Sequence, residues 1–257
     1  MTAPIAVQLY TLRDHIDTDP SPMFDQLAQA GLVGVESAGM YGRTAEQYGA
    51  ALRAAGLELC SAHIGIDPRS DRWRDDFAAE LDAHRTAGAT RAVVPMLFPN
   101  QFSDLDRVAR SAELLNAAND IARARDMTLG YHNHFWEFVE LDGRHALNHL
   151  FDRCDPSLFA EIDIYWATVG GVDAATLVAD LGDRVRLLHI KDGPADSHES
   201  AMVAVGQGAV PIADIVHAAP AAEWHIIELD RCETDMVDAV IASHDFLATS
   251  GLSTSAR

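Results

Sequence analysis

Strand-like and helix-like segments take turns along this chain, and this alternation constrains the fold more than any other feature of the sequence. Amphipathic stretches, with apolar residues three and four positions apart, lie between short runs rich in apolar and β-branched residues. The clearest helical stretches are residues 23–31, 45–56, 75–88 and 108–125. The eight strand-like runs are residues 4–10, 31–37, 57–65, 90–97, 128–135, 158–166, 185–192 and 224–230.

Strict alternation predicts a parallel sheet, because neighbouring parallel strands need a crossover connection and the crossover is normally a helix. Eight such units in 257 residues match a single (β/α)8 TIM barrel, an α/β fold of roughly 250 residues. A doubly wound open sheet is the alternative, but the segment QLYTLRD after the first strand lacks the glycine-rich phosphate loop of such sheets. No Pro/Ser/Gly-rich linker divides the chain, so we expect one domain over residues 1–257.

The charge of the chain disfavours several kinds of partner. With 19 basic and 39 acidic residues the formal net charge is −20, which repels nucleic-acid phosphates and anionic lipid. The sequence has no signal-peptide pattern and no apolar stretch long enough to span a membrane, so we expect a cytoplasmic protein. A small neutral sugar or a metal cation is the expected partner. The 3 cysteines form no C-x-x-C pair, which argues against disulfides and a zinc knuckle.

Titratable residues gather at the ends of the predicted strands. Active sites of (β/α)8 barrels lie at the carboxyl ends of the strands, and core packing does not require His, Asp or Glu at so many of them. We therefore expect an active site at this rim. Its candidate residues are Glu36, His63, the segment YHNHFWE at 131–137, Asp163, His189, Lys191, Asp192, Glu228 and Asp230.

Side-chain alternation along a strand sorts these candidates by face. If Asp163 faces the barrel axis, Glu161 does too, one layer deeper, and His189 shares its face with Lys191. Asp163, His189 and Glu228 then form a mixed oxygen and nitrogen donor set, which suits Mn²⁺, Mg²⁺ or Co²⁺. A hydrogen-bonded network without metal is the alternative for these three residues, and a salt bridge to Asp163 or Glu161 is the alternative for Lys191.

The chain resembles the xylose isomerase-like superfamily of barrel enzymes, in particular its sugar isomerase, epimerase and inosose dehydratase members. The resemblance covers all eight units and rests on the segments VQLYTLRD, YHNHFWEF, EIDIYWATVGGVD, LLHIKDG, VGQGAVP and HIIELD. Members hold a divalent metal with Glu, Asp, His and Glu on the fifth to eighth strands. The resemblance assigns the last three ligands to Asp163, His189 and Glu228. His132 stands where the epimerases have the first Glu, and the His-x-His at this strand end resembles the dehydratases more closely.

We expect His132 to be the fourth ligand, with Glu137 as the alternative. A neutral imidazole can coordinate a metal, but it lowers the negative charge of the ligand set and removes the carboxylate that the epimerases use as a base. His134 lies on the same side of the strand, further out, where it would meet the substrate. Glu137 falls where related epimerases place a substrate-binding Glu. Helix capping or loop hydrogen bonding is the alternative for His134 and Glu137.

Further substrate contacts are expected from the strand ends and from aromatic rings. Trp166 can stack on the apolar face of a sugar, with core burial as the alternative. Tyr10 and Trp136 are weaker stacking candidates. The glycines of VGQGAVP are explained by loop geometry and are assigned no chemistry. The expected substrate-binding residues are Glu36, His63, Glu137, Trp166 and Asp192.

These residues predict a metal-dependent sugar isomerase or epimerase that forms an enediolate from a keto-sugar or keto-glycoside. The ion, Mn²⁺ in the first place and Co²⁺ or Mg²⁺ as alternatives, would polarise a carbonyl and its neighbouring hydroxyl. The base would be Glu228, His134 or Lys191. The lack of an arginine cluster or glycine-rich nest argues against a phosphorylated substrate.

Three other functions stay open. A lyase or dehydratase would carry out β-elimination on a keto-cyclitol or 3-keto-glycoside from the same enediolate. A metal-free aldolase would form a Schiff base on Lys191. A non-catalytic barrel would bind a sugar, for example as an accessory subunit, and the sequence also leaves a homo-oligomer open.

Overall fold

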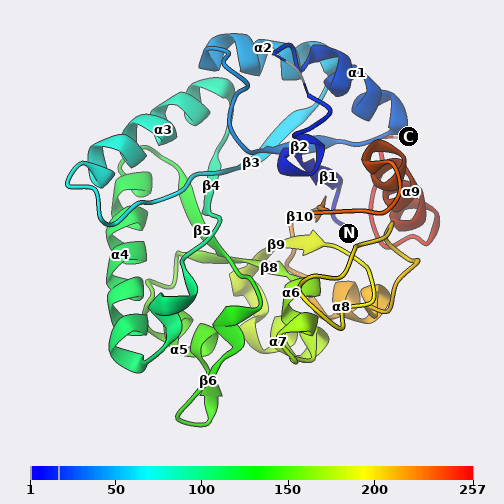
Figure 1. The fold of residues 1–257 in the computed structure, drawn as a ribbon. Helices are drawn as coiled ribbons and strands as arrows, with labels where there is room; N and C mark the ends of the chain where they lie inside the picture. Colours follow the sequence, from blue (N-terminus) through cyan, green and yellow to red (C-terminus); the bar gives the residue numbers. More distant parts are fainter. Residues whose placement is uncertain (1, 17, 257) are drawn as a thin grey trace.

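The computed structural model describes residues 2–16 and 18–256, and in it eight parallel strands close into one barrel (Figure 1). This confirms the predicted (β/α)8 architecture, and each strand-like run of the sequence contains one barrel strand. Around the barrel the order is β1, β10, β9, β8, β5, β4, β3, β2. The strands are β1 (Ile5–Gln8), β2 (Gly34–Ser37), β3 (Glu58–His63), β4 (Arg91–Val94), β5 (Thr128–His132), β8 (Phe159–Asp163), β9 (Val185–Ile190) and β10 (Trp224–Ile227).

Helices surround the barrel and connect its strands (Figure 1). Gly31 and Gly56 end α1 and α2 with φ of 104° and 77°, a conformation that glycine adopts without steric cost. The helices are α1 (Ser21–Ala30), α2 (Ala45–Ala55), α3 (Trp73–Ala87), α4 (Leu105–Arg123), α5 (Ala146–Arg153), α6 (Ile164–Val169), α7 (Ala174–Leu181), α8 (Ile212–Ala218) and α9 (Met236–Thr249). Among the described residues, no helix is long and apolar enough to cross a membrane.

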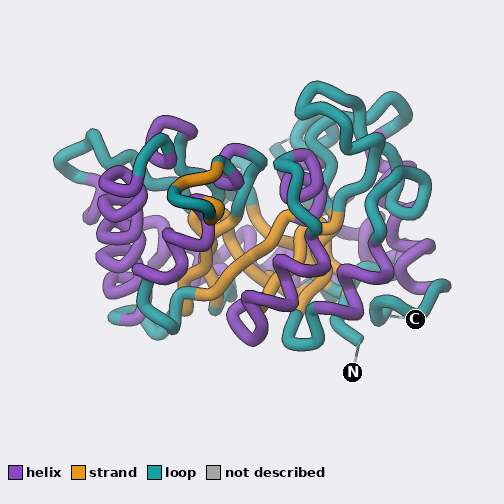
Figure 2. Tube along the Cα trace, turned by 90° about the horizontal axis from the view of Figure 1, so that it is seen from below, coloured by secondary structure: helices purple, strands orange, loops and turns teal. Residues whose placement is uncertain are grey.

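The barrel closes because β1 pairs on both sides, with Ile5 opposite His225 of β10 and Ala6 opposite Gly34 of β2. Near the two ends of the chain, Pro4 bridges Thr254. This end of the barrel lies at the bottom of Figure 2, and the longer loops rise from the opposite end, where the strands finish. One of these loops carries the small hairpin of β6 (Glu140–Leu141) and β7 (Arg144–His145).

The apolar core has two parts. The larger part lies between the strands and the helices, and it includes Leu188 and Ile190, as strand alternation predicts. The smaller part, here called the apolar plug, fills the lower barrel interior. Its buried members are Ala6, Cys60, Val93, Phe159, Leu187, Trp224 and Ile226.

Candidate active site and metal centre

The candidate site begins one layer above the apolar plug, where the barrel interior becomes polar. On four strands, a buried polar residue follows a plug residue by two positions and therefore faces the same side. The face that buries apolar atoms below thus presents hydrogen-bonding and ligating atoms above. The pairs are Ala6 and Gln8, Phe159 and Glu161, Leu187 and His189, and Ile226 and Glu228.

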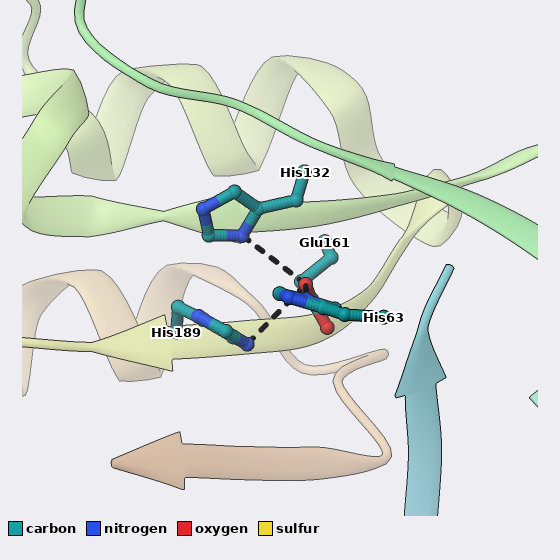
Figure 3. Close-up of side chains that lie close together, drawn as sticks. All are labelled: His63, His132, Glu161 and His189. Atoms are coloured by element: carbon teal, nitrogen blue, oxygen red, sulfur yellow. Dashed lines mark hydrogen bonds and ion pairs between the residues drawn. The ribbon is translucent and has the colours of Figure 1, made fainter. Parts of the chain in front are cut away.

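Glu161 lies at the centre of this layer, and three imidazole rings converge on one of its oxygens. Its Oε2 atom is 2.8 Å from His63 Nε2, 3.1 Å from His132 Nδ1 and 3.2 Å from His189 Nε2 (Figure 3). The rings come from β3, β5 and β9, and Glu161 comes from β8. Glu161 is fully buried, and its other oxygen, Oε1, has no hydrogen-bond partner.

A second buried carboxylate, Glu36 at the end of β2, borders this cluster. It accepts hydrogen bonds from Gln8 Nε2 at 2.6 Å and from Ser61 Oγ at 2.5 Å. Its Oε2 atom also lies 3.0 Å from His63 Nε2 and 2.8 Å from His189 Nε2. Burial opposes ionisation of Glu36, but the charges of His63 and His189 outweigh it and hold the pKa well below its usual range.

The two histidines between these carboxylates are cationic at neutral pH. Burial disfavours the charged ring of His63, yet Glu36 and Glu161 raise its pKa to about 10. His189 is also buried, and Glu161, Glu228 and Glu36 raise its pKa well above the ordinary value. Carboxylates within hydrogen-bond distance thus decide the protonation of both rings.

Lys191 lies among three further carboxylates at the carboxyl end of β9. Its Nζ atom is 2.9 Å from Asp163 Oδ2, 2.6 Å from Glu228 Oε2 and 2.7 Å from Asp230 Oδ2. The salt bridge to Asp163 is one of the alternatives that the sequence left open. Burial opposes the charge of Lys191, but Asp163, Asp230 and Glu228 raise its pKa well above the ordinary value. The ammonium group is therefore charged at neutral pH.

His132 and His134 differ from these cations because both rings are neutral. Burial and the neighbouring positive charges lower the pKa of His132 well below its ordinary value. Burial, followed by the charge of Lys191, lowers the pKa of His134 to about 3. The ring of His134 stacks on Trp136 with centroids 4.4 Å apart, and its Nδ1 atom is buried without a hydrogen-bond partner.

A cavity of about 400 Å³ opens over this cluster. One part of its lining is polar and includes six of the candidate residues at the strand ends, and the rest is formed by the largely apolar side chains of Tyr10, Ala38, Pro95 and Met96. A larger hollow of about 610 Å³ lies elsewhere, between the β6–β7 hairpin and α7. Neither group of converging metal donors lies in this hollow. The residues that line the smaller cavity are Tyr10, Ala38, His63, Pro95, Met96, His132, His134, Lys191, Glu228 and Asp230.

Glu137 is turned away from the cluster. Its Oε1 atom accepts a hydrogen bond from the Tyr131 hydroxyl at 2.6 Å, and its Oε2 atom accepts one from the His134 backbone N–H at 3.0 Å. Burial raises the pKa of Glu137 to about 8, although the Tyr131 hydrogen bond lowers it. This is the loop hydrogen bonding that the sequence left open as an alternative, and Glu137 does not belong to either group of converging metal donors.

Asp192 is also engaged by its own loop. Its two carboxylate oxygens accept hydrogen bonds from four backbone N–H groups, and Asp192 does not line the cavity. A Cβ atom at Gly208 would lie 2.1 Å from Asp192 Oδ1, which explains one glycine of VGQGAVP by close approach. The donors are Gly193 (2.8 Å), Gly206 (2.9 Å), Gly208 (2.9 Å) and Val210 (3.1 Å).

Trp166 is buried beside the site, with the Lys191 Nζ atom 5.2 Å from its ring centroid. Its backbone N–H donates to Asp163 Oδ1 at 2.8 Å, so Asp163 also caps α6. Trp166 does not line the cavity, and the structure shows the core burial that the sequence left open for this ring.

Three side chains of the cluster received no role from the sequence. Strand alternation placed Glu161 one layer below Asp163, on the same face of the strand. The structure has Glu161 buried in the barrel interior, as this alternation predicts. Gln8 and Ser61 carried no signal of their own, because a single polar residue within a strand has many ordinary explanations. Their importance appears only when β1, β2 and β3 lie side by side and both side chains contact Glu36.

The donors fit a divalent ion in two overlapping ways. In each of two groups of four residues, one donor atom per residue can be chosen so that all lie within 4.8 Å of one another. Imidazole nitrogens combined with carboxylate oxygens are ligands of Mn²⁺, Co²⁺ and Zn²⁺. Glu161 Oε1 is buried and has no hydrogen-bond partner. Binding to a metal ion would give this oxygen the polar partner that it lacks. The inner set is His63, His132, Glu161 and His189; the outer set, predicted from the sequence, is His132, Asp163, His189 and Glu228.

A closed eight-stranded barrel with a titratable cluster at the carboxyl ends of its strands defines a protein of the (β/α)8 barrel class. Within this class, a family model described as "xylose isomerase-like TIM barrel" matches residues 24–249. The chain belongs to this family. Comparison with curated proteins gives no match.

Solved structures share the fold over nearly the whole chain. A sugar phosphate isomerase/epimerase from Parabacteroides distasonis ATCC 8503 has a TM-score of 0.85 at 22% identity, covering 99% of this chain and 96% of that one. The probable 3-DHS dehydratase AsbF from Bacillus anthracis has a TM-score of 0.76 at 14% identity, covering 96% and 98%. The IOLI protein with a bound zinc atom has a TM-score of 0.76 at 11% identity, covering 96% and 97%. At these identities the likeness is one of fold.

Proposed function

We propose that this protein is a divalent-metal-dependent sugar isomerase or epimerase that acts through an enediolate of a keto-sugar or keto-glycoside. One observation carries the proposal. A donor cluster fit for a divalent ion lies under the same cavity as two groups that can accept a proton, His134 and Glu228. The names of the structural relatives, which include an isomerase/epimerase and a zinc-bound protein, agree with this chemistry.

The ligands of the proposed ion include His132 and His189, because both donor sets contain them. The sequence-predicted set adds Asp163 and Glu228. When bound, the ion would polarise the carbonyl and the adjacent hydroxyl of the substrate, which makes the proton on the neighbouring carbon more acidic. Mn²⁺ is the expected ion, with Co²⁺ and Mg²⁺ as alternatives.

The side chains around the cavity would move the proton. Glu228 is a carboxylate, because Lys191 and His189 outweigh burial and hold its pKa well below the ordinary range, so it can accept the carbon-bound proton. His134 is neutral because burial lowers its pKa to about 3, and its unpartnered Nδ1 would take up or return a proton only in exchange with the reacting substrate. Lys191 keeps its charge and would stabilise a developing negative oxygen. A charged ammonium is a poor Schiff-base nucleophile, which disfavours the aldolase.

β-Elimination by a lyase or dehydratase is the second candidate, and one observation favours it. The Lys191 ammonium lies 2.6 Å from Glu228 Oε2, so an acid and a base adjoin at the cavity wall. Elimination needs such a pair, because the base removes a proton while the acid protonates the leaving group.

Proton NMR in D₂O tests these proposals with the metal-loaded protein, prepared with Mn²⁺ and in parallel with Co²⁺ or Mg²⁺, and a panel of keto-sugars and 3-keto-glycosides. We expect solvent deuterium to replace one proton next to the carbonyl and an epimer or isomer to appear, with both effects lost in Glu228→Gln. An unsaturated product would assign the protein to the lyases instead. Saturable sugar binding without deuterium exchange or product would contradict the proposal that the protein is an enzyme. It would favour a sugar-binding barrel.

A further inference from the structure

The opening of the cavity over the donor cluster is partly apolar. Among the described residues, the large apolar side chains that are exposed to solvent are Tyr10, Met96, Phe98 and Val139. Tyr10 and Met96 line the cavity, and Phe98 follows Met96 by two positions on the loop after β4. A single exposed apolar side chain needs no explanation, but several gathered at one opening are typical of a binding surface.

The loop after β4 holds two of these side chains outward. Leu97, between Met96 and Phe98, is 1% exposed. Its carbonyl oxygen accepts a hydrogen bond from Trp136 Nε1 at 3.0 Å, and its N–H donates to the Tyr131 hydroxyl at 3.4 Å. Because Leu97 is buried and both of its backbone groups are bonded, Met96 and Phe98 cannot turn inward unless these bonds break. The loop therefore presents both side chains before a ligand arrives, which lowers the entropic cost of binding.

Tyr10 is fixed at the same opening by a different contact. The Arg13 guanidinium carbon lies 4.1 Å from the centroid of the Tyr10 ring. Arg13 also donates hydrogen bonds to the carbonyl oxygens of Tyr10 at 2.8 Å and Asp230 at 2.9 Å. Tyr10 follows β1 and Met96 follows β4, and β2 and β3 lie between these strands in the barrel. The two side chains thus reach the cavity from different directions.

The cavity is polar on one part of its wall and apolar on another. His134, Lys191 and Glu228 can pair with sugar hydroxyls, whereas Tyr10 and Met96 offer mainly hydrocarbon. A hydroxyl buried against hydrocarbon loses its hydrogen bonds to water, so a ligand that fills the cavity should be polar at one end and apolar at the other. The volume of about 400 Å³ falls within the roughly 300–1,000 Å³ of pockets for drug-sized ligands, which are larger than one sugar ring.

The apolar surface continues past the cavity along the loop after β4. Met96 lines the cavity, and Phe98 lines a neighbouring hollow of about 410 Å³. The other residues around this hollow are Pro68, Arg69, Asn100 and Gln101. A group that leaves the cavity over Met96 therefore meets a second ring and a second hollow.

We propose that the substrate is a glycoside with an aromatic aglycone, which packs against Tyr10, Met96 and Phe98 while its sugar ring lies beside the titratable residues. An aromatic group suits these side chains, because rings pack edge-to-face or offset and methionine sulfur makes favourable contacts with rings. This inference rests on the proposed function, and within it selects the keto-glycoside over the free keto-sugar.

Isothermal titration calorimetry of the metal-loaded protein with methyl and phenyl β-glycosides of glucose and galactose tests the proposal. These probes carry no keto group, so turnover does not disturb the titration. We expect a phenyl glycoside to bind at least about 10-fold more tightly than its methyl partner, because the phenyl ring leaves water. Replacing both Met96→Ser and Phe98→Ser should reduce this preference to less than about 3-fold.

Val139→Ser is the matched control, since Val139 is similarly exposed but does not line the cavity. This variant should keep the wild-type preference for phenyl glycosides. Equal affinities for methyl and phenyl glycosides, or no binding of either, would overturn the aglycone site and leave the proposed function with free keto-sugars. A phenyl preference that survives the double replacement would also overturn it.

Sedimentation velocity distinguishes the aglycone site from an interface between two copies of the chain. An oligomer that dissociates in the Met96→Ser and Phe98→Ser double variant, while the phenyl preference stays at the wild-type value, would assign these side chains to that interface and overturn the proposal. A phenyl preference that is lost in the double variant, without proton exchange on any keto-sugar or keto-glycoside, would contradict only the proposed function.

Discussion

His132 and His134 lie two residues apart and line the same cavity, but their contacts differ. His132 has a carboxylate near each ring nitrogen, Glu161 on one side and Asp163 on the other. His134 stacks on the Trp136 ring and has an unpartnered Nδ1. The first arrangement is suited to a ligand that is fixed in place, and the second to a group that meets substrate.

Replacement by glutamine should therefore lower metal affinity at His132 and the turnover rate at His134. His132→Gln is expected to weaken metal affinity, with activity partly restored at high Mn²⁺ because mass action offsets poorer ligation. His134→Gln is expected to keep metal affinity and to lower kcat by about 10²- to 10⁴-fold, the usual contribution of a positioned acid or base. Metal titration followed by steady-state rates at saturating metal measures both. Full activity of His134→Gln would assign the proton transfer to Glu228 or Lys191.

Glu137 should make stability depend on pH. Its pKa is about 8 in the folded protein against roughly 4.3 in an unfolded chain, so folding favours its protonated form. This contribution is complete below the unfolded pKa and is lost as pH rises through the folded pKa. We expect the free energy of unfolding of the metal-free protein to fall by on the order of a few kcal/mol between about pH 5 and about pH 9.

Urea unfolding at several pH values measures this slope. Glu137→Gln should flatten it, because an amide does not titrate, whereas Glu140→Gln at an exposed position nearby should not change it. A Glu137→Gln slope equal to that of the wild type would show that other groups cause the pH dependence.

At the scale of elements, the loop after β9 is organised by one side chain. Asp192 accepts four backbone hydrogen bonds, three of them from residues 206–210. The loop thereby runs back over the end of β9, next to the Lys191 site. The sequence indicated a polar strand-end residue and two glycines, but only the folded loop shows that these features are parts of one arrangement.

Asp192→Asn is expected to destabilise the protein by about 1–3 kcal/mol, because an amide NH₂ group would face backbone donors that it cannot satisfy. Amide hydrogen exchange should accelerate across residues 204–210, and thermal unfolding should shift to a lower temperature. Asp196→Asn is the matched control, since Asp196 is exposed and accepts a hydrogen bond from the Ser200 hydroxyl rather than from the backbone. Equal melting temperatures for the two variants would contradict this role for Asp192.

At the scale of the whole molecule, the apolar plug requires close packing between strands. A Cβ atom at Gly130 of β5 would lie 2.3 Å from the Phe159 ring of β8. We expect Gly130→Ala to destabilise the barrel by about 1–3 kcal/mol, the usual effect of overpacking. Gly65→Ala is the control, because a Cβ atom there meets nothing within 4 Å. Thermal unfolding of both variants measures the difference, and an unchanged stability of Gly130→Ala would show that the plug can adjust.

The sequence by itself determined the barrel and the level at which its site lies. Eight alternating units specify the fold because parallel strands need crossovers, and a period of two along each strand specifies which side chains face inward. Glu161 with Asp163, and His189 with Lys191, follow from this period. The polar rim was expected from the strand ends, whereas the apolar plug beneath it was seen only in the structure.

Only the tertiary structure decided which atoms meet across the barrel. Strand period fixes the face of a residue, but contacts between non-neighbouring strands depend on barrel closure, register and side-chain rotamer. His189 thus meets Glu36, 153 positions away in the sequence, and Lys191 lies between Asp163 and Glu228. Glu137 turns to Tyr131 and Asp192 to its own loop, because local backbone and hydroxyl donors satisfy these carboxylates before the cavity is reached.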